Sequence, residues 1–163
     1  MSQKPPVTAA IRVLRAHRVV FSDHLYDYEE KGGTRVSSQA LGVDEHVVIK
    51  TLIMQDEQRK PLIVLMHGDC EVSTRNLARQ IGVKTITPCP PEVANKHSGY
   101  LVGGTSPFGT RNPMPVYMQA SIVDLEKIYL NGGKRGYLVG LSPQAILPIL
   151  QPTLVDVAIP KDA

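Results

Sequence analysis

Two apolar segments separated by a charged turn constrain the fold of this chain more than any other feature of its sequence. Residues 47–54 read Val-Val-Ile-Lys-Thr-Leu-Ile-Met, and residues 61–66 read Pro-Leu-Ile-Val-Leu-Met. Short runs rich in branched apolar residues are typical of buried strands. Because residues 56–60 between them are polar, we expect the two segments to pair as a hairpin within a sheet.

The remaining expected elements follow one another without a regular alternation of strand and helix. Helices are expected at five places: after Thr8, over 37–41, from Ser73 to Gly82, over 92–96 and after Ser142. Further strands are expected over 19–28, 115–119, 127–130 and 137–141. This mixed order favours one α+β domain over residues 1–163, with a mixed or partly closed sheet, rather than a doubly wound fold.

Composition and charge exclude several classes of protein. The 163 residues are 42% hydrophobic and 20% charged, which is ordinary for a globular domain and excludes a disordered or coiled-coil chain. The net charge of +3 permits contact with a polyanion without requiring it. Cys70 and Cys89 form no Cys/His ligand spacing, and no apolar stretch of about 18 residues occurs. We therefore expect a soluble cytoplasmic protein without a metal ion or other cofactor.

A glycine-rich segment is the first candidate for chemistry. Residues 99–110 contain four glycines, which allow backbone conformations that other residues resist. Backbone N–H groups exposed in this way can hold a carboxylate, a phosphate or an oxyanion. A tight turn between strands explains the glycines equally well, and neither the P-loop pattern nor G-x-G-x-x-G is present.

Two cationic features are further candidates. Residues 131–136 read Asn-Gly-Gly-Lys-Arg-Gly, which suits a phosphate contact or, alternatively, a solvated hairpin tip. Lys50 lies within an apolar strand, where a charge costs free energy unless it is paired or points to a cleft. Strand alternation places Val48, Lys50 and Leu52 on one face. If that face lines a pocket, Lys50 is a site residue; if it faces water, Lys50 is a surface charge.

Patterns of known hydrolases are absent from the sequence. The five histidines form no H-E-x-x-H motif, and no G-x-S-x-G segment occurs. The run His67-Gly68-Asp69-Cys70 suggests a Cys/His nucleophile, but proximity in sequence is not the required spatial geometry. We favour a structural thiol at Cys70.

Three segments match a known family in order and spacing. They are Lys50-Thr51-Leu52, residues 99–107 and residues 132–136, and the similarity extends from the first expected helix to the last. On these segments the chain resembles the YbaK/EbsC family of Cys-tRNA(Pro) and Cys-tRNA(Cys) deacylases, which is similar to the editing domain of bacterial prolyl-tRNA synthetases. The resemblance implies an α+β fold with a mixed, partly closed, β-barrel-like sheet surrounded by helices.

The resemblance also implies an activity that edits misacylated tRNA in trans. A pocket shaped for proline cannot strongly exclude cysteine, so a second site must remove the error. In the family, the thiol of the cysteine attacks its own ester carbonyl, without a metal ion or a protein nucleophile. The implied partners are Cys-tRNA(Pro) and prolyl-tRNA synthetase, with no membrane and no DNA. Two alternatives stay open: hydrolytic editing of another small residue, such as Ala-tRNA(Pro), and a non-catalytic module that binds tRNA or the synthetase.

Matching the family motifs to this sequence implies the site residues. Lys50 would anchor the aminoacyl-adenosine end of the tRNA, and the amides around Gly103 and Gly104 would hold the carbonyl or the ribose. Lys134 and Arg135 would contact tRNA phosphates. The residues expected to bind the substrate are Tyr26, Thr51, Thr105, Ser106, Asn131 and Gly132.

Two positions depart from the family pattern. Gly33 and its neighbours replace an aromatic-containing stretch of some members, and Leu138 occupies a position that is acidic or polar in others. The preferred amino acid therefore follows less directly from the resemblance than the editing activity does.

Overall fold

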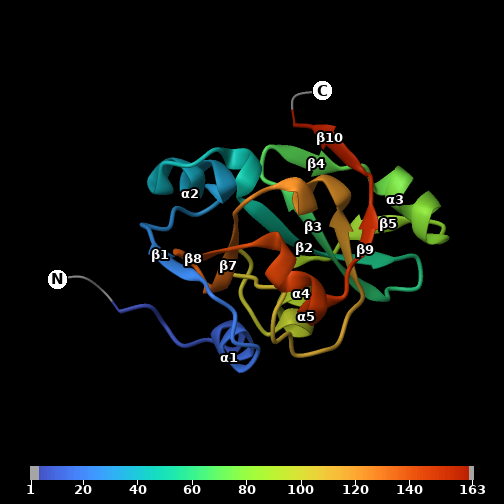
Figure 1. Cartoon of the computed structure of the whole chain (residues 1–163). Coiled ribbons are helices and arrows are strands. Elements are labelled where there is room, and N and C mark those ends of the chain that lie inside the picture. Colours follow the sequence, from blue (N-terminus) through green and yellow to red (C-terminus); the bar gives the residue numbers. More distant parts are fainter. Residues whose placement is uncertain (1–3, 162–163) are drawn as a thin grey trace.

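The two apolar segments form the central hairpin of the computed structural model, which describes residues 4–161 (Figure 1). Strand β2 (Ile49–Asp56) pairs antiparallel with β3 (Pro61–His67), from Ile49 opposite His67 to Gln55 opposite Pro61. The hairpin expected from the sequence is therefore confirmed.

Three short strands extend the hairpin into a mixed five-stranded sheet of order β5-β2-β3-β6-β9. Strand β5 pairs antiparallel with β2, whereas β6 and β9 continue the sheet in parallel from β3. The added strands are β5 (Ile86–Pro88), β6 (Val116–Gln119) and β9 (Thr153–Val155). The mixed sheet expected from the element order is present.

Two smaller antiparallel sheets accompany the large one, and the expected partly closed barrel is not found in the described part of the chain. One contains β1 (Ser22–Leu25), β8 (Tyr137–Leu141) and β7 (Ile128–Lys134), and the other contains β4 (Cys70–Val72) and β10 (Ala158–Pro160). A single parallel bridge, Val48 to Tyr129, joins β7 to the start of β2. Among the described residues the pairing with β7 stops at this bridge, and the far end of β2 pairs with β5.

All five expected helices are present, although the second begins at Gly33, four residues before the expected start, and the fourth is longer than the expected 92–96. Thr8, Ser73 and Ser142 each accept a backbone N–H at a helix start. The five α-helices are α1 (Ala9–Ala16), α2 (Gly33–Leu41), α3 (Thr74–Ile81), α4 (Pro91–Ser98) and α5 (Pro143–Leu150), and the 3₁₀ helices are η1 (Glu45–Val47) and η2 (Ala120–Asp124). Within residues 4–161, no helix has the length and hydropathy needed to cross a membrane.

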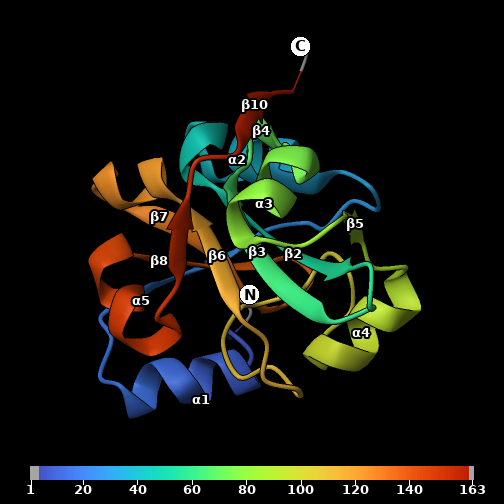
Figure 2. The same cartoon turned by 90° about the vertical axis from the view of Figure 1, so that its right-hand side faces the viewer.

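Strand β3 separates two hydrophobic cores. Ile63 and Leu65 pack on one face with residues of α1, α4, α5 and the three-stranded sheet, and Val64 and Met66 pack on the other face with α3. Figures 1 and 2 show α3 on one side of the central strands and α1 with α5 on the other. Both faces of β3 are therefore covered by packed side chains, so β3 itself presents no open surface.

Candidate functional site

The glycine loop (residues 99–110) lies against the β7–β8 turn (residues 131–136). A Cβ atom added to Gly104 would lie 2.6 Å from the backbone N of Arg135 and 2.8 Å from the carbonyl carbon of Lys134. The side-chain amide of Asn131 donates to the carbonyl of Gly103 at 3.1 Å. The structure thus brings together two segments that the sequence singled out separately.

Asn131 shapes this turn from inside. Its side-chain oxygen accepts the backbone N–H groups of Gly133 at 2.7 Å and Lys134 at 3.0 Å. Gly133 has a φ of +101°, a conformation that L side chains rarely adopt. One amide side chain therefore fixes the turn and, through its nitrogen, the glycine loop.

The amides of Gly103 and Gly104, which the resemblance implies as substrate donors, differ in their hydrogen bonding, and that of Gly104 is engaged within the loop. It donates to the carbonyl of Leu101 at 2.8 Å, so it is already paired within the loop. Gly103 is exposed and has a φ of +92°, and its N–H has no hydrogen-bond partner among the residues that the structure describes. The amide of Gly103 is therefore one of the N–H groups of this loop that have no partner among the described residues, whereas the amide of Gly104 is not.

Tyr28 is a member of the site that sequence reasoning missed. Its hydroxyl lies 2.6 Å from the position of a Cβ atom on Gly103. The guanidinium of Arg135 stacks 5.2 Å from the centre of the Tyr28 ring, and its Nε donates to the carbonyl of Val102 at 2.9 Å. The sequence could have indicated Tyr28 through its spacing from Tyr26, because residues two apart in an extended segment point to the same side.

Tyr26 lies beside the same turn. Its backbone N–H donates to the carbonyl of Gly136 at 2.9 Å. Burial, and then the neighbouring Tyr28, raise the pKa of the Tyr26 phenol, so it is neutral at physiological pH. An open hollow of about 630 Å³ adjoins it, lined by Leu25, Tyr26, Asp27, Glu29, Val36, Gln39 and Ala40.

The strand register places Lys50 on the face that carries Asn131. Asn131 pairs with Leu138, and Tyr129, two residues earlier, bridges Val48 in parallel. Since paired residues and residues two apart share a face, Lys50 lies on the face of Asn131 and Leu138. Leu138 is buried on this face although it belongs to neither hydrophobic core.

The ammonium of Lys50 is held at the start of β4. Its Nζ donates to the carbonyl oxygen of Cys70, and no described contact joins it to the glycine loop. Burial, and then the positive charge of Lys161, lower the pKa of this half-buried amine. In this structure the Lys50 ammonium is therefore engaged at β4 and not at the glycine loop.

Thr51 points away from Lys50. Strand alternation places it with Ile49 and Ile53, which belong to the larger core. Its buried hydroxyl has no hydrogen-bond partner in the described residues. This placement gives no support to the predicted role of Thr51 in substrate binding.

Three other predicted site residues hold the loops in shape. Ser106 is fully buried, and its hydroxyl accepts the N–H of Phe108 at 3.1 Å. The Thr105 hydroxyl donates to a carbonyl of the same loop at 3.3 Å. Gly132 is also buried, and its carbonyl accepts the hydroxyl of Thr8.

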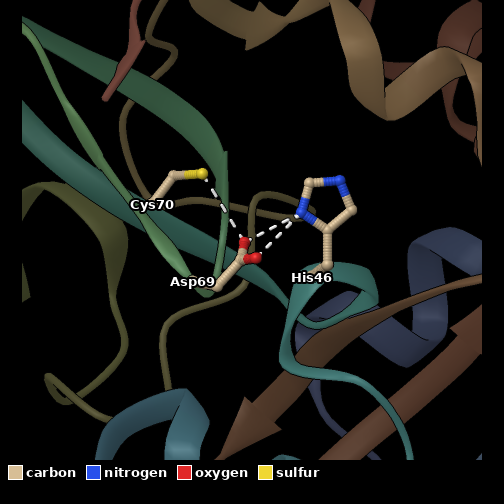
Figure 3. A group of neighbouring side chains, drawn as sticks. All are labelled: His46, Asp69 and Cys70. Carbon is tan, nitrogen blue, oxygen red and sulfur yellow. Dashed lines mark hydrogen bonds and ion pairs between the residues drawn. The ribbon is translucent and has the colours of Figure 1, made fainter. Parts of the chain in front are cut away.

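Cys70 lacks the partner that an activated thiol requires. Figure 3 shows a carboxylate between the imidazole and the thiol: His46 Nδ1 is 2.9 Å from Asp69 Oδ1, which lies 3.5 Å from the sulfur of Cys70. Burial and then the charge of Asp69 raise the pKa of the Cys70 thiol. His67 is engaged elsewhere, with the His46 carbonyl at 2.8 Å and the Ser121 hydroxyl at 2.7 Å. A Cys/His nucleophile is therefore not formed.

The net charge of the chain is concentrated in one segment. Residues 72–91 contain Arg75, Arg79 and Lys84 without any Asp or Glu, whereas the whole chain has 18 basic and 15 acidic residues. The rest of the chain thus carries 15 of each. Between α3 and β5 these three cations line an open hollow of about 490 Å³, and Glu57 accepts the Lys84 N–H nearby.

Comparison with known proteins identifies the class. The family model described as "Aminoacyl-tRNA editing domain" matches residues 31–148, so the chain belongs to this family. It is 27% identical over 143 residues to EbsC of Enterococcus faecalis, which is assigned as a Cys-tRNA(Pro)/Cys-tRNA(Cys) deacylase, and the match covers 87% of each chain. The family expected from the sequence is confirmed.

Two further relatives extend the comparison. The proline–tRNA ligase of Streptococcus equi subsp. zooepidemicus is 26% identical over 129 residues, which are 77% of this chain and 21% of the ligase. A crystal structure described as a trans-editing enzyme for prolyl tRNA synthetase superposes with a TM-score of 0.80 at 19% identity, covering 95% of this chain and 99% of that one. The structural likeness supports the fold.

Proposed function

We propose that this protein removes cysteine from Cys-tRNA(Pro), and from Cys-tRNA(Cys), by helping the cysteine thiol to attack its own ester carbonyl. The new bond joins sulfur to the carbonyl carbon, the ester bond to the ribose breaks, and the thiol proton passes to the ribose oxygen. The products are free tRNA and a cyclic thiolactone. Family membership and the unpaired amide of Gly103 beside Asn131 support this proposal.

The protein's contribution is orientation and charge stabilisation. The Gly103 N–H is an unpaired donor for the developing oxyanion, whereas the Gly104 N–H is already paired within the loop. Asn131 fixes the carbonyl side of the same residue, so the donor is held before the substrate arrives. Lys50 lies on the face of Asn131. Its ammonium releases the Cys70 carbonyl and then anchors the aminoacyl-adenosine end of the tRNA. Tyr26 lines the adjoining hollow.

The tRNA body is proposed to contact two basic regions. Lys134 is exposed beside the glycine loop, whereas Arg135 uses its Nε to hold the carbonyl of Val102. The basic hollow between α3 and β5 offers further cations, and its lining contains no aromatic side chain for base stacking. Such a surface favours contact with phosphates over readout of bases.

A deacylation panel tests the proposal. The protein is incubated separately with Cys-, Ala-, Ser- and Pro-tRNA, and the remaining charged tRNA and the released thiolactone are measured. We expect selective loss of cysteine with the thiolactone as product. Loss of alanine with cysteine untouched indicates the hydrolytic alternative, and binding of tRNA without any deacylation indicates a non-catalytic module.

Lys50→Ala tests the assigned anchor. Since a hydrogen bond to a charged group contributes about 1.5–3 kcal/mol, we expect kcat/KM to fall about 10- to 150-fold. Lys60→Ala, at an exposed lysine in the β2–β3 turn, is the matched control and should keep the wild-type rate. Full activity of a folded Lys50→Ala variant would remove Lys50 from the site.

A further inference from the structure

Three different metal-ligating atoms converge where η1 meets the turn between β3 and β4 (Figure 3). His46 Nδ1, an oxygen of Asp69 and the sulfur of Cys70 all lie within 4.8 Å of one another. We propose that these residues bind a thiophilic divalent metal ion, with Zn²⁺ as its type. The sequence did not indicate the site, because His46 is 23 residues from Asp69.

Two of the three donor–donor distances are close to those of a tetrahedral ion, and the third, from His46 Nδ1 to the Cys70 sulfur, is within 4.8 Å. Metal–ligand distances of about 2.0–2.3 Å place neighbouring donors about 3.3–3.7 Å apart. The sulfur of Cys70 and Oδ1 of Asp69 are already 3.5 Å apart. The nitrogen of His46 lies 2.9 and 3.1 Å from the two Asp69 oxygens, so an ion requires this pair to separate by only about 0.5 Å.

His67 orients the imidazole ligand. The rings of His46 and His67 are stacked with their centres 3.7 Å apart and their planes 7° from parallel. Both nitrogens of His67 have partners, the carbonyl of His46 and the hydroxyl of Ser121. His67 is therefore a positioning residue and not a fourth ligand, because it fixes the ring plane in which Nδ1 of His46 points at Asp69.

The donor set selects the class of ion. Nitrogen, oxygen and sulfur together favour Zn²⁺ and similar ions, whereas Mg²⁺ and Ca²⁺ take oxygen ligands. On binding, the Cys70 thiol releases its proton to solvent and the sulfur donates an electron pair to the ion, so nothing is oxidised. The side chains of His46 and Asp69 are 41% and 42% exposed, which leaves an entry path and room for water as the fourth ligand.

The charges around the cluster are balanced. Lys50 donates to the carbonyl of Cys70, and Lys161 pairs with Glu45 at 3.2 Å. Glu45 and Glu71 both act on Lys50 electrostatically and bring two negative charges to the same region. The ion therefore enters surroundings in which its charge is not opposed by a net positive potential.

Cobalt provides a direct test on the full-length protein with reduced thiols. Titration of the metal-free protein with Co²⁺ should give a sulfur-to-cobalt charge-transfer band that saturates at one equivalent, and calorimetry should give the same stoichiometry for Zn²⁺. Cys70→Ser should abolish the band and weaken Zn²⁺ binding more than about 100-fold, since even second-shell partners contribute about 10- to 100-fold. Cys89→Ser, at the other cysteine of the chain, should change neither readout.

Substitution of the remaining residues refines the assignment. His46→Gln should weaken binding as Cys70→Ser does, and His67→Ala should weaken it about 10- to 100-fold while keeping the band. The proposal is overturned if the folded wild type gives no cobalt–thiolate band and no heat with Zn²⁺, or if Cys70→Ser binds as the wild type does. None of these readouts depends on deacylation, so the metal site and the proposed function stand or fail separately.

Discussion

Replacing Gly104 with alanine tests the contact between the glycine loop and the β7–β8 turn. The added Cβ would lie 2.6 Å from the backbone N of Arg135 and 2.8 Å from the carbonyl carbon of Lys134. These are main-chain atoms, which cannot rotate out of the way as the end of a side chain can. The glycine loop must therefore move away from the turn in the Gly104→Ala variant.

The expected cost of Gly104→Ala follows from this collision alone, because Gly104 does not have a positive φ. Overpacking of a well-packed position costs about 1–3 kcal/mol. For a chain of this length, each kcal/mol lowers Tm by about 2–4 °C, so we expect a decrease of about 2–12 °C. A displacement of about 1 Å near reacting groups can cost about 100-fold in rate, and we expect a loss of that size in kcat/KM for Cys-tRNA(Pro).

Gly82→Ala is the matched control for Gly104→Ala. Gly82 has a φ of +80° and nothing within 4 Å of an added Cβ, so alanine costs only about 1–2 kcal/mol of backbone strain. Urea unfolding should show both variants destabilised, whereas deacylation should fall only in Gly104→Ala. A Gly104→Ala variant with wild-type stability and wild-type kcat/KM would refute the close approach of the two segments.

Two further predictions concern stability. Thr8→Ala removes the cap of α1 and the hydroxyl that donates to the Gly132 carbonyl. Urea unfolding should show a loss of about 1–2 kcal/mol in the free energy of unfolding, and Thr8→Ser should restore most of it. An unchanged unfolding midpoint in Thr8→Ala would contradict this prediction. Burial and then Lys127 lower the pKa of His24 below its ordinary value of 6.5, so the unfolded chain binds this proton more readily. Stability should therefore fall as the pH drops through about 6.5. His24→Gln should lessen the difference between the urea-unfolding midpoints at about pH 7.5 and about pH 5.5. An undiminished difference in this variant would contradict the assignment to His24.

Elements with local signals could be predicted from the sequence. Helix α3 is an example, since Ser73 accepts the N–H of Asn76 at its start and Gly82 adopts a left-handed conformation at its end. Both signals act within a few residues. The β2–β3 hairpin is similar, because its two apolar runs and polar turn are contiguous in the chain.

The edge strands could not be predicted in this way. Strands β4, β5, β9 and β10 have three residues each, which is too short for a periodic pattern. Strand β10 forms only because Ala158 and Pro160 lie opposite Val72 and Cys70, far away in the sequence. The barrel expectation also depended on long-range pairing, and β7 pairs with the chain at the start of β2 only through the Val48–Tyr129 bridge in the described residues.

The candidate site was predictable as segments and not as contacts. Glycine and lysine–arginine motifs marked both loops, yet the pairing of Gly104 with Leu101 and the position of Tyr28 over Gly103 depend on the folded loop. No spacing rule reports which amide stays unpaired. This is why the resemblance implied both Gly103 and Gly104 as donors, whereas of these two only Gly103 has an N–H without a partner in the described structure.

Lys50 connects the proposed deacylase site with the proposed metal site. Val48, two residues before it, bridges Tyr129, two residues before Asn131, while the Lys50 ammonium donates to the carbonyl of Cys70. A substrate can recruit Lys50 only by offering an acceptor that replaces this carbonyl, and hydrogen bonds of charged donors contribute about 1.5–3 kcal/mol. The phosphate or ribose oxygens of an aminoacyl-adenosine end provide such acceptors. Strand alternation places Lys50 on the face of Asn131, so the proposed recruitment requires the ammonium to exchange the Cys70 carbonyl for a substrate acceptor.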